Sequence, residues 1–368
     1  MPFPHIPLYT KTMSLLTVSH LQKRFNLEAG FFARFGRFVN AVNDVSFSIG
    51  KNEAYGLVGE SGCGKTTTAR LLVRMYETDS GQILYHREGQ AEAPADVSHF
   101  KKEELKSYRE KVRYVFQDPA RSLNPRMNVY EILVSGCRSS ARRRGTGERE
   151  LRGEAAAILE EVGLSAADLE RRPSEFSGGQ RQRISIARGL LMRPQLLICD
   201  EVVSALDVSI QGQILNLLLD IRDKRDISFL FIAHDLKVAC YFCDRIGVMY
   251  QGELMEEAPA ANLYREGVHP YTRLLFSSVE GGSLPPRSGL AKASPPLPPS
   301  AGAPGKAGTS APATPPAGIP GCASAQHCIS TQHCAFAPRC PAATERCFRE
   351  HPELCENSEG HLLRCFNA

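Results

Sequence analysis

Apolar residues form short runs that alternate with helical patterns between about residues 15 and 264. Four of these runs are apolar throughout and lack the alternation of apolar and polar positions that marks a half-exposed strand. Strands that are covered on both faces have this pattern. The runs therefore predict buried strands at residues 54–58, 196–199, 229–233 and 245–250. Such strands interleaved with helices predict an α/β fold.

Helical patterns supplement these strands. One predicted helix face is formed by Ile210, Ile214, Leu217, Leu218 and Ile221, which recur at helical spacing. Between residues 118 and 190 the strand signals fade and charged helical patterns dominate. We therefore expect a helical insertion over about residues 118–190, inside a domain that covers residues 13–265 with a short extension at 266–280.

The two ends of the chain differ from this domain. Residues 281–321 are rich in Pro, Ala, Gly and Ser, so they bury too little apolar surface to offset the entropy of ordering and predict a linker. The Cys-rich tail that follows, residues 322–368, is expected to be a separate small module. Residues 1–12 show no periodic pattern, and Met13 stands just before the first apolar run. We expect residues 1–12 to be untranslated or poorly ordered.

Composition narrows the class of protein. The chain is 42% hydrophobic and 23% charged, and its net charge of +4 is too small to indicate a nucleic-acid partner. No apolar run approaches the roughly 18 to 20 residues that span a bilayer, and the N-terminus has no signal-peptide pattern. Five of the 12 cysteines are scattered and seven crowd into the tail. Scattered cysteines suit a reducing cytosol, where a terminal cluster is more often metal-binding than disulfide-bonded.

A glycine-rich loop follows the first predicted buried strand. The motif G-x-x-x-x-G-K-[ST] fits Gly59, Glu60, Ser61, Gly62, Cys63, Gly64, Lys65 and Thr66, and it opens a helical pattern. We expect these residues and the following Thr67 to bind the nucleotide. Glycines allow successive backbone N–H groups to converge on an anion, and the helix N-terminus adds its dipole. Lys65 can reach the β- and γ-phosphates of ATP, and the Thr66 hydroxyl can bind Mg²⁺. The strand–loop–helix context argues against a chance match in a Gly-rich turn.

Two adjacent carboxylates end the predicted strand at residues 196–199. Asp200 would bind Mg²⁺ directly or through water, and Glu201 would polarise the water that attacks ATP. Acidic residues at the end of a strand are often only a solvated turn. Downstream of a phosphate loop, the catalytic interpretation is favoured.

Residues 176–180 (FSGGQ) resemble the signature motif of the ABC ATPases, which usually begins with Leu. A Ser hydroxyl, flexible glycines and a helix N-terminus form a second anion cradle. The resemblance implies that Ser177, Gly178, Gly179 and Gln180 contact the ATP held by the opposite subunit. Two cassettes would then have to dimerise to complete either site.

Further positions match the same family. Gln117 resembles the Q-loop residue that senses Mg²⁺ and the attacking water, and Asp207 resembles the D-loop residue that reaches across the dimer. His234 stands where the family's switch histidine would touch the γ-phosphate. Phe25 matches the aromatic platform for adenine, a role for which Phe31, Phe32 and Phe35 compete. The family commonly has Pro after the Asp-Glu pair, where this chain has Val202; we expect a slight shift in geometry and persisting hydrolysis.

Several segments resemble the oligopeptide/dipeptide importers in particular, namely FQDP, SLNPRM, FSGGQRQR, VSALDVSIQGQ and HPYTRLL. The resemblance implies a P-loop NTPase cassette with a RecA-like α/β core, a β-subdomain and a helical insertion. It implies ATP hydrolysis coupled to solute import, with a second, homologous ATPase as heterodimer partner. It also implies docking on two membrane permeases at the cytoplasmic face of the membrane, with a binding protein outside the membrane that delivers the solute.

Two other classes of ABC ATPase match this sequence less well. A soluble ABC ATPase of DNA repair or translation generally carries two cassettes or a long coiled coil, and an exporter ATPase lacks the HPYTRLL segment. Relatives of the importers move peptides, nickel and some sugars. The transported solute is not visible in this sequence.

The tail resembles the cluster-binding end of the peptide importer ATPases through HCAFAPRCPAATERC and HLLRC, with His333 where the family often has Gly. The resemblance implies a 4Fe–4S cluster on Cys334, Cys340, Cys347 and Cys365, at a place distant from Lys65. Thiolates suit zinc as well as iron–sulfur clusters, so zinc is the alternative. Cys328 could replace Cys334, since Gln-His-Cys occurs twice, whereas Cys322 and Cys355 are expected to be free thiols.

Overall fold

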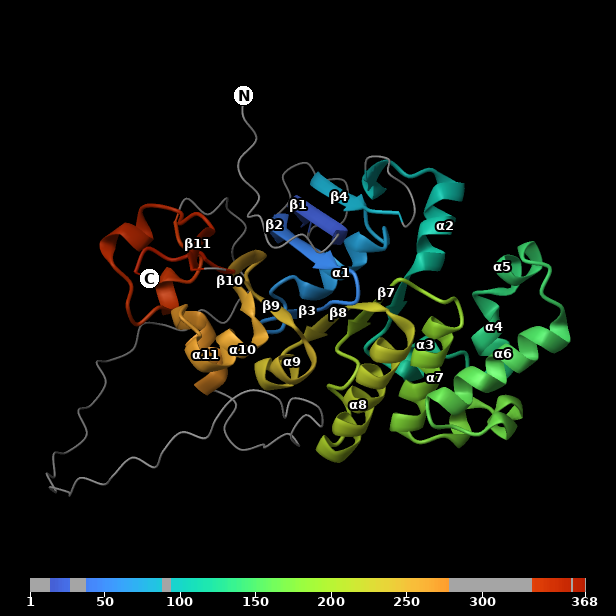
Figure 1. Cartoon of the computed structure of the whole chain (residues 1–368). Coiled ribbons are helices and arrows are strands. Elements are labelled where there is room, and N and C mark those ends of the chain that lie inside the picture. The colour runs from blue at the N-terminus through green and yellow to red at the C-terminus, as the bar shows by residue number, and fades with distance from the viewer. Residues whose placement is uncertain (1–13, 27–37, 88–93, 278–332, 359, 368) are drawn as a thin grey trace, which may run out of the picture.

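The computed structural model describes residues 14–26, 38–87, 94–277, 333–358 and 360–367 (Figure 1). The hypotheses on residues 1–12, on Phe31, Phe32 and Phe35, on the linker at 281–321, and on Cys322 and Cys328 lie outside these residues.

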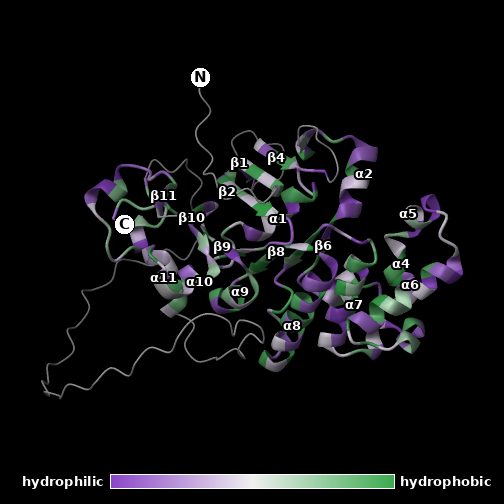
Figure 2. Cartoon of the chain, in the orientation of Figure 1, coloured by the Kyte–Doolittle hydropathy of each residue, from purple (hydrophilic) through white to green (hydrophobic). Residues whose placement is uncertain are grey.

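A twisted sheet forms the centre of the described chain. Its parallel part runs in the order β9, β3, β8, β7, β6. These strands are β9 (Arg245–Tyr250), β3 (Ala54–Val58), β8 (Ser228–Ala233), β7 (Leu196–Asp200) and β6 (Val112–Val115). All four buried strands predicted from the apolar runs are confirmed, because β3, β7, β8 and β9 are buried at every residue. Figure 2 shows the contrast between the hydrophobic β8 in the sheet and the hydrophilic surface helix α2 (Lys102–Lys111).

A smaller antiparallel sheet covers one side of the central sheet. Its order is β2 (Phe38–Gly50), β1 (Ser14–Asn26), β4 (Ser80–Tyr85) and β5 (Ala95–Asp96). Leu16, Leu21 and Ile49 from this sheet share one hydrophobic core with Leu57 and Met249 from the central sheet. This sheet is the expected β-subdomain.

Helices flank the central sheet. α1 (Lys65–Leu72) follows β3, and α8 (Val208–Arg225) precedes β8. α9 (Leu236–Phe242) packs on β3 and β8, and α10 (Ala260–Glu266) and α11 (Pro270–Ser277) pack against α9. In α8, Ile214, Leu218 and Ile221 are fully buried, whereas Ile210 and Leu217 pack at the rim of the core. The predicted helix face is therefore the buried one.

Between β6 and β7 the chain is helical. It contains α3 (Pro119–Ser122), α4 (Val129–Ser135), α5 (Arg138–Arg143), α6 (Glu148–Glu161) and α7 (Gly178–Leu190), which lie to one side of the sheet (Figure 1). Apolar residues of α4, α6 and α7, such as Leu133, Leu159 and Ile184, are buried in a core that continues into the central sheet. Within the described residues, no helix has both the length and the apolar character to cross a membrane.

The Cys-rich end of the chain is part of the central sheet. A hairpin of β11 (Cys355–Ser358) and β12 (His361–Leu363) pairs with β10 (Glu253–Pro259), which pairs with β9. Phe336 is 1% exposed and belongs to the same core as Tyr271. The expected separate module is not what the structure describes. The physical reason is that β12 covers the edge of β10, which would otherwise present unpaired backbone groups.

Candidate functional site

The glycine-rich loop connects β3 to α1, at the carboxyl end of the parallel strands. Gly64 has a φ of 109°, a left-handed conformation that side chains disfavour. A Cβ atom there would lie 2.1 Å from the carbonyl oxygen of Ala41, and one on Gly59 would lie 2.1 Å from that of Met249. Glycine is thus required at both positions, while Ser61 and Gly62 are exposed at the crown of the loop.

Lys65 is 4% exposed and bridges the start of the loop. Its ammonium group donates hydrogen bonds to the carbonyl oxygens of Gly59, at 2.7 Å, and Glu60, at 2.9 Å. The neighbouring Cys63 is buried, and burial raises the pKa of its thiol, so Cys63 adds no negative charge. The arrangement places one positive charge inside a glycine-rich loop at the start of a helix, which fits a bound polyphosphate.

Asp200 connects the loop to the end of β7. Its carboxylate accepts a hydrogen bond from the Thr66 hydroxyl at 3.0 Å and another from the Tyr114 hydroxyl at 2.5 Å. Asp200 is 2% exposed, so these two donors stabilise a buried charge. A hydroxyl beside a carboxylate is the ligand pair that Mg²⁺ takes in P-loop NTPases, so the residues fit that ion.

Tyr114 was missed by the sequence reasoning. It lies on β6, next to β7 in the sheet, and faces Asp200 only because the two strands pair. Burial and the charge of Asp200 raise the pKa of Tyr114, so its hydroxyl keeps its proton and remains a donor. The only available signal was its place at the end of an apolar run, three residues before Gln117.

Glu201 and Gln117 meet beside this pair. The side-chain amide of Gln117 donates to the carboxylate of Glu201 at 2.6 Å. Glu201 has a φ of 48°, and its backbone N–H donates to the carbonyl of Ile232 on β8. The following Val202 is 2% exposed, so the residue that departs from the family pattern is anchored in the core. The contact between Glu201 and Gln117 is present with valine at this position.

The remaining sequence-predicted residues lie on other elements. His234 is exposed at the end of β8, next to the strand that carries Asp200. Phe25 on β1 is half-buried and packs edge-on against Tyr76 with 5.2 Å between ring centres. Asp207 is exposed and precedes the first residue of α8.

The signature motif opens α7. Ser177 and Gln180 form a reciprocal cap, in which the Ser177 hydroxyl accepts from the Gln180 N–H and the Gln180 side chain accepts from the Ser177 N–H. A Cβ atom on Gly179 would lie 2.8 Å from Ile210 of α8, so this glycine permits close packing, and Gly178 is exposed beside it. α7 and α1 lie apart in the molecule (Figure 1). The structure does not bring the signature motif and the phosphate loop of this chain together.

The four tail cysteines lie near one another. Cys334 and Cys347 are buried, and the backbone N–H of Cys334 donates to the carbonyl of Cys347 at 3.0 Å. Burial first, and then the nearby Cys347 and Cys365, raise the pKa of the Cys334 thiol; burial, Cys340 and Cys347 raise that of Cys365. Among the described residues, however, no three His, Cys, Asp or Glu side chains stand in a metal-holding arrangement. The expected metal site is therefore not supported by the structure.

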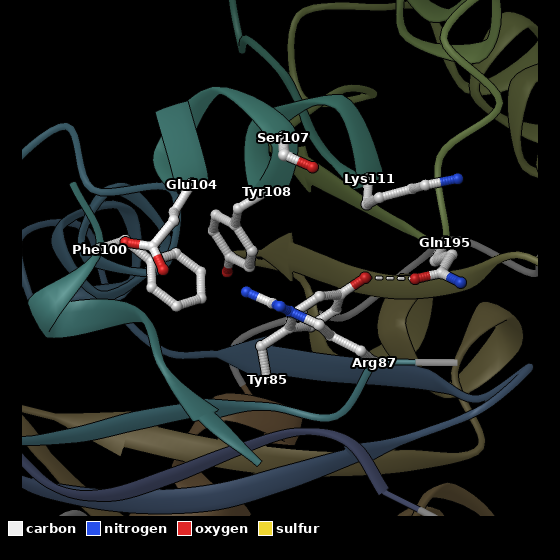
Figure 3. A pocket seen from close by; sticks show the side chains of 8 residues that line it. All are labelled: Tyr85, Arg87, Phe100, Glu104, Ser107, Tyr108, Lys111 and Gln195. Atoms are coloured by element: carbon white, nitrogen blue, oxygen red, sulfur yellow. Dashed lines mark hydrogen bonds between the residues drawn. The ribbon is translucent and has the colours of Figure 1, made fainter. Parts of the chain in front are cut away.

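A cavity of about 280 Å³ lies elsewhere in the protein (Figure 3). Aromatic side chains of Tyr85, Phe100 and Tyr108 form its floor, and the Tyr85 hydroxyl donates to Gln195. Lys111 and Gln195 immediately precede β6 and β7, so the cavity opens at the amino ends of these strands, opposite the phosphate loop. It takes no part in the chemistry at Asp200.

A parallel sheet with a phosphate loop, an Asp-Glu pair at a strand end and a capped glycine signature helix defines an ATP-binding cassette. Comparisons with known proteins agree. Residues 42–204 match the family described as ABC transporter, and residues 255–347 match the family described as oligopeptide/dipeptide transporter, C-terminal region. The solved structure of the cassette MJ0796 bound to ADP and Pi superposes with a TM-score of 0.57 at 24% identity, covering 67% of this chain and 98% of that one.

Curated relatives define the branch of the family. The chain is 44% identical to the oligopeptide transport ATP-binding protein OppF of Bacillus subtilis over 270 residues, which are 73% of this chain and 83% of the relative. It is 39% identical to AppF of the same organism over 357 residues, 96% of this chain and 97% of the relative. The chain therefore belongs to the ABC transporter ATP-binding proteins of the oligopeptide/dipeptide type.

Proposed function

We propose that this chain is the ATP-hydrolysing subunit that powers an importer of oligopeptides or dipeptides. Two contacts at one sheet edge carry the proposal, Thr66 with Asp200 and Gln117 with Glu201. They unite the residue types that hold Mg²⁺ and those that orient water, next to the ammonium of Lys65. The names of the relatives support a peptide as the transported solute.

The residues have distinct roles in this proposal. Lys65, the loop from Gly59 to Thr67 and the platform Phe25 bind the nucleotide. Thr66, Asp200 and Gln117 are the residues that would hold Mg²⁺, which would neutralise charge on the phosphates when bound. The carboxylate of Glu201 accepts from Gln117, which leaves its other oxygen to orient a water molecule. His234 approaches the γ-phosphate from the end of the neighbouring strand.

The signature motif and Asp207 serve the partner in this proposal. Since α7 lies apart from α1, the cradle formed by Ser177, Gly178, Gly179 and Gln180 is left for the ATP of a second, homologous ATPase. Contacts that exist only in the closed pair give ATP the differential affinity that a conformational switch needs. Two permeases in the membrane and a solute-binding protein beyond it would complete the importer, with this chain at the cytoplasmic face.

A transport assay tests this function. Cells that lack the chain should fail to accumulate a labelled tripeptide, and the wild-type chain should restore uptake. The Lys65→Ala variant, expressed to the same level, should not, because the loop loses its charge. Restoration of uptake by Lys65→Ala would show that this ATP site does not drive peptide import.

For the tail, we propose that Cys334, Cys340, Cys347 and Cys365 hold a 4Fe–4S cluster. The backbone hydrogen bond from Cys334 to Cys347 keeps these two buried residues together, and thiolates are the ligands such clusters take. Anaerobically purified protein should be brown and contain about four iron and four sulfide per chain. A Cys347→Ser variant should lose both, whereas Cys355→Ser should keep them. Colourless protein with stoichiometric zinc would show that these residues bind zinc and not an iron–sulfur cluster.

A further inference from the structure

Glu60 of the phosphate loop uses all three of its polar groups. Its carbonyl oxygen accepts from the Lys65 ammonium at 2.9 Å, and its backbone N–H donates to the Tyr271 hydroxyl at 2.9 Å. Its carboxylate accepts two hydrogen bonds from the guanidinium of Arg339, each at 2.8 Å. Residues from three distant parts of the sequence thus meet on one residue of the loop.

The position of Arg339 is determined by aromatic side chains. Arg339 is the last residue of a short helical turn, η5 (Ala337–Arg339), and this turn follows the buried Phe336 directly. The Phe336 ring packs against Tyr250 and Tyr271, each with 5.3 Å between ring centres. The guanidinium of Arg339 lies over the Tyr250 ring, 5.7 Å from its centre. The tail therefore presents Arg339 to the loop from a packed platform.

Charge gives this contact a consequence for nucleotide binding. A free carboxylate on Glu60 would place a negative charge on the loop that binds the phosphates of ATP. The bidentate pair with Arg339 cancels that charge and orients the side chain. The hydrogen bonds from Arg339 lower the pKa of Glu60, with a further contribution from the charge of Lys65, so the carboxylate is ionised and needs this partner.

We propose that Arg339 is a positioning residue for the ATP site, through which the Cys-rich tail sets the affinity of the phosphate loop for nucleotide. The inference rests on the nucleotide site proposed above. It also corrects the expectation that the tail is distant from Lys65, since Glu60 contacts both Lys65 and Arg339.

Equilibrium binding of MgATP to the full-length chain tests the proposal. Arg339→Ala should weaken binding about two- to fivefold, the range of a partly exposed ion pair, and the loss should shrink at high salt. Arg339→Lys, which keeps the charge without the bidentate geometry, should lose less. Arg349→Ala is the matched control, because Arg349 pairs with Glu345 on the surface of the same segment.

The decisive variant is the double mutant Glu60→Gln with Arg339→Ala. Because this variant has no unpaired carboxylate, its affinity for MgATP should equal that of Glu60→Gln alone, within error. If the role of Arg339 were merely structural, the double mutant would not recover this affinity. If Arg339→Ala does not fold, Arg339→Gln takes its place. Wild-type affinity in Arg339→Ala, or a double mutant no better than Arg339→Ala, would overturn the inference. Retained binding in Lys65→Ala would instead overturn the ATP site itself.

Discussion

At the scale of single residues, Asp200 is the most constrained member of the site. Its buried carboxylate is held between the hydroxyls of Thr66, on the loop, and Tyr114, on the neighbouring strand. Thr66 is a candidate Mg²⁺ ligand, so Tyr114 is the donor left to keep Asp200 oriented when the ion is bound. This gives Tyr114 a supporting role that a motif search does not assign.

Replacing Tyr114 by Phe tests this role. Loss of one hydrogen bond to a buried charge should cost on the order of 2 kcal/mol of stability and raise the Mg²⁺ concentration at half-maximal ATPase activity. Tyr241→Phe is the control, because its hydroxyl contacts Asn216 at a more exposed place. An unchanged Mg²⁺ dependence in Tyr114→Phe would show that Asp200 needs no support from β6.

The sequence reasoning found residues inside contiguous motifs and missed those brought in by tertiary contact. Gly59 to Thr66 could be predicted because the loop's backbone geometry dictates its own residues. The roles of Tyr114 and Arg339 cannot be assigned from the local sequence, since their partners, Asp200 and Glu60, are contacted across strands or from the far end of the chain. Long-range pairing of this kind depends on register and packing, which periodicity alone does not determine.

At the scale of elements, the tail is attached to β10 by both strand pairing and buried polar contacts. His361 on β12 contacts the carboxylate of Glu256 at 2.6 Å, and the backbone N–H of His269 donates to the same carboxylate at 3.1 Å. Phe336 supplies the apolar part of the attachment. The tail could be predicted as Cys-rich, but its strands could not, because β11 and β12 have only four and three residues and are too short to show a periodic pattern.

Phe336→Ala should remove the apolar anchor. Truncating a buried Phe costs about 3 to 5 kcal/mol, so the midpoint of thermal unfolding should fall by several degrees. Phe348 is 52% exposed in the same segment, and Phe348→Ala should leave the midpoint almost unchanged. Equal midpoints for the two variants would mean that the tail does not share the core of the cassette.

The buried His269, next to the contact between the tail and β10, predicts that the stability of the protein depends on pH. His269 is 1% exposed, its Nδ1 accepts from the Tyr271 N–H at 3.0 Å, and burial lowers its pKa to about 4. The unfolded chain takes up this proton near pH 6.5, whereas the folded chain stays neutral until about pH 4. The contribution of the neutral His269 to the free energy of unfolding is therefore fully present above pH 6.5. It is lost as the pH drops toward 4, by on the order of 3 kcal/mol.

Urea unfolding at pH 7.5 and at pH 5 measures this effect. A His269→Gln variant, which cannot be protonated, should lose less stability between the two pH values than the wild type. His99→Gln is the control, since His99 is exposed. Glu256 has a lowered pKa and contributes only to losses at more acidic pH, below its usual value of 4.5, because the folded carboxylate keeps its charge there. If His269→Gln lost as much stability between pH 7.5 and pH 5 as the wild type, His269 would not be the group responsible for the pH dependence.

At the scale of the whole molecule, the cassette carries two half-sites that face different ligands. The phosphate loop and the Asp200–Glu201 pair lie at one edge of the sheet, and the signature motif lies apart on α7 (Figure 1). ATP hydrolysis by this chain is therefore expected to need a second cassette. The fold class and the family could be predicted from the sequence because each motif is local, whereas the union of the tail with the central sheet could not.

The most direct test of this account is steady-state ATP hydrolysis by the assembled transporter carrying Glu201→Gln. The variant keeps the shape of the side chain but lacks the charge that orients water. It should bind ATP normally, trap a closed cassette pair and lose nearly all turnover by this subunit. Glu160→Gln, at an exposed position of α6, is the matched control and should hydrolyse ATP at the wild-type rate. Near-normal turnover in the Glu201→Gln complex would contradict the assignment of Glu201 as the catalytic carboxylate.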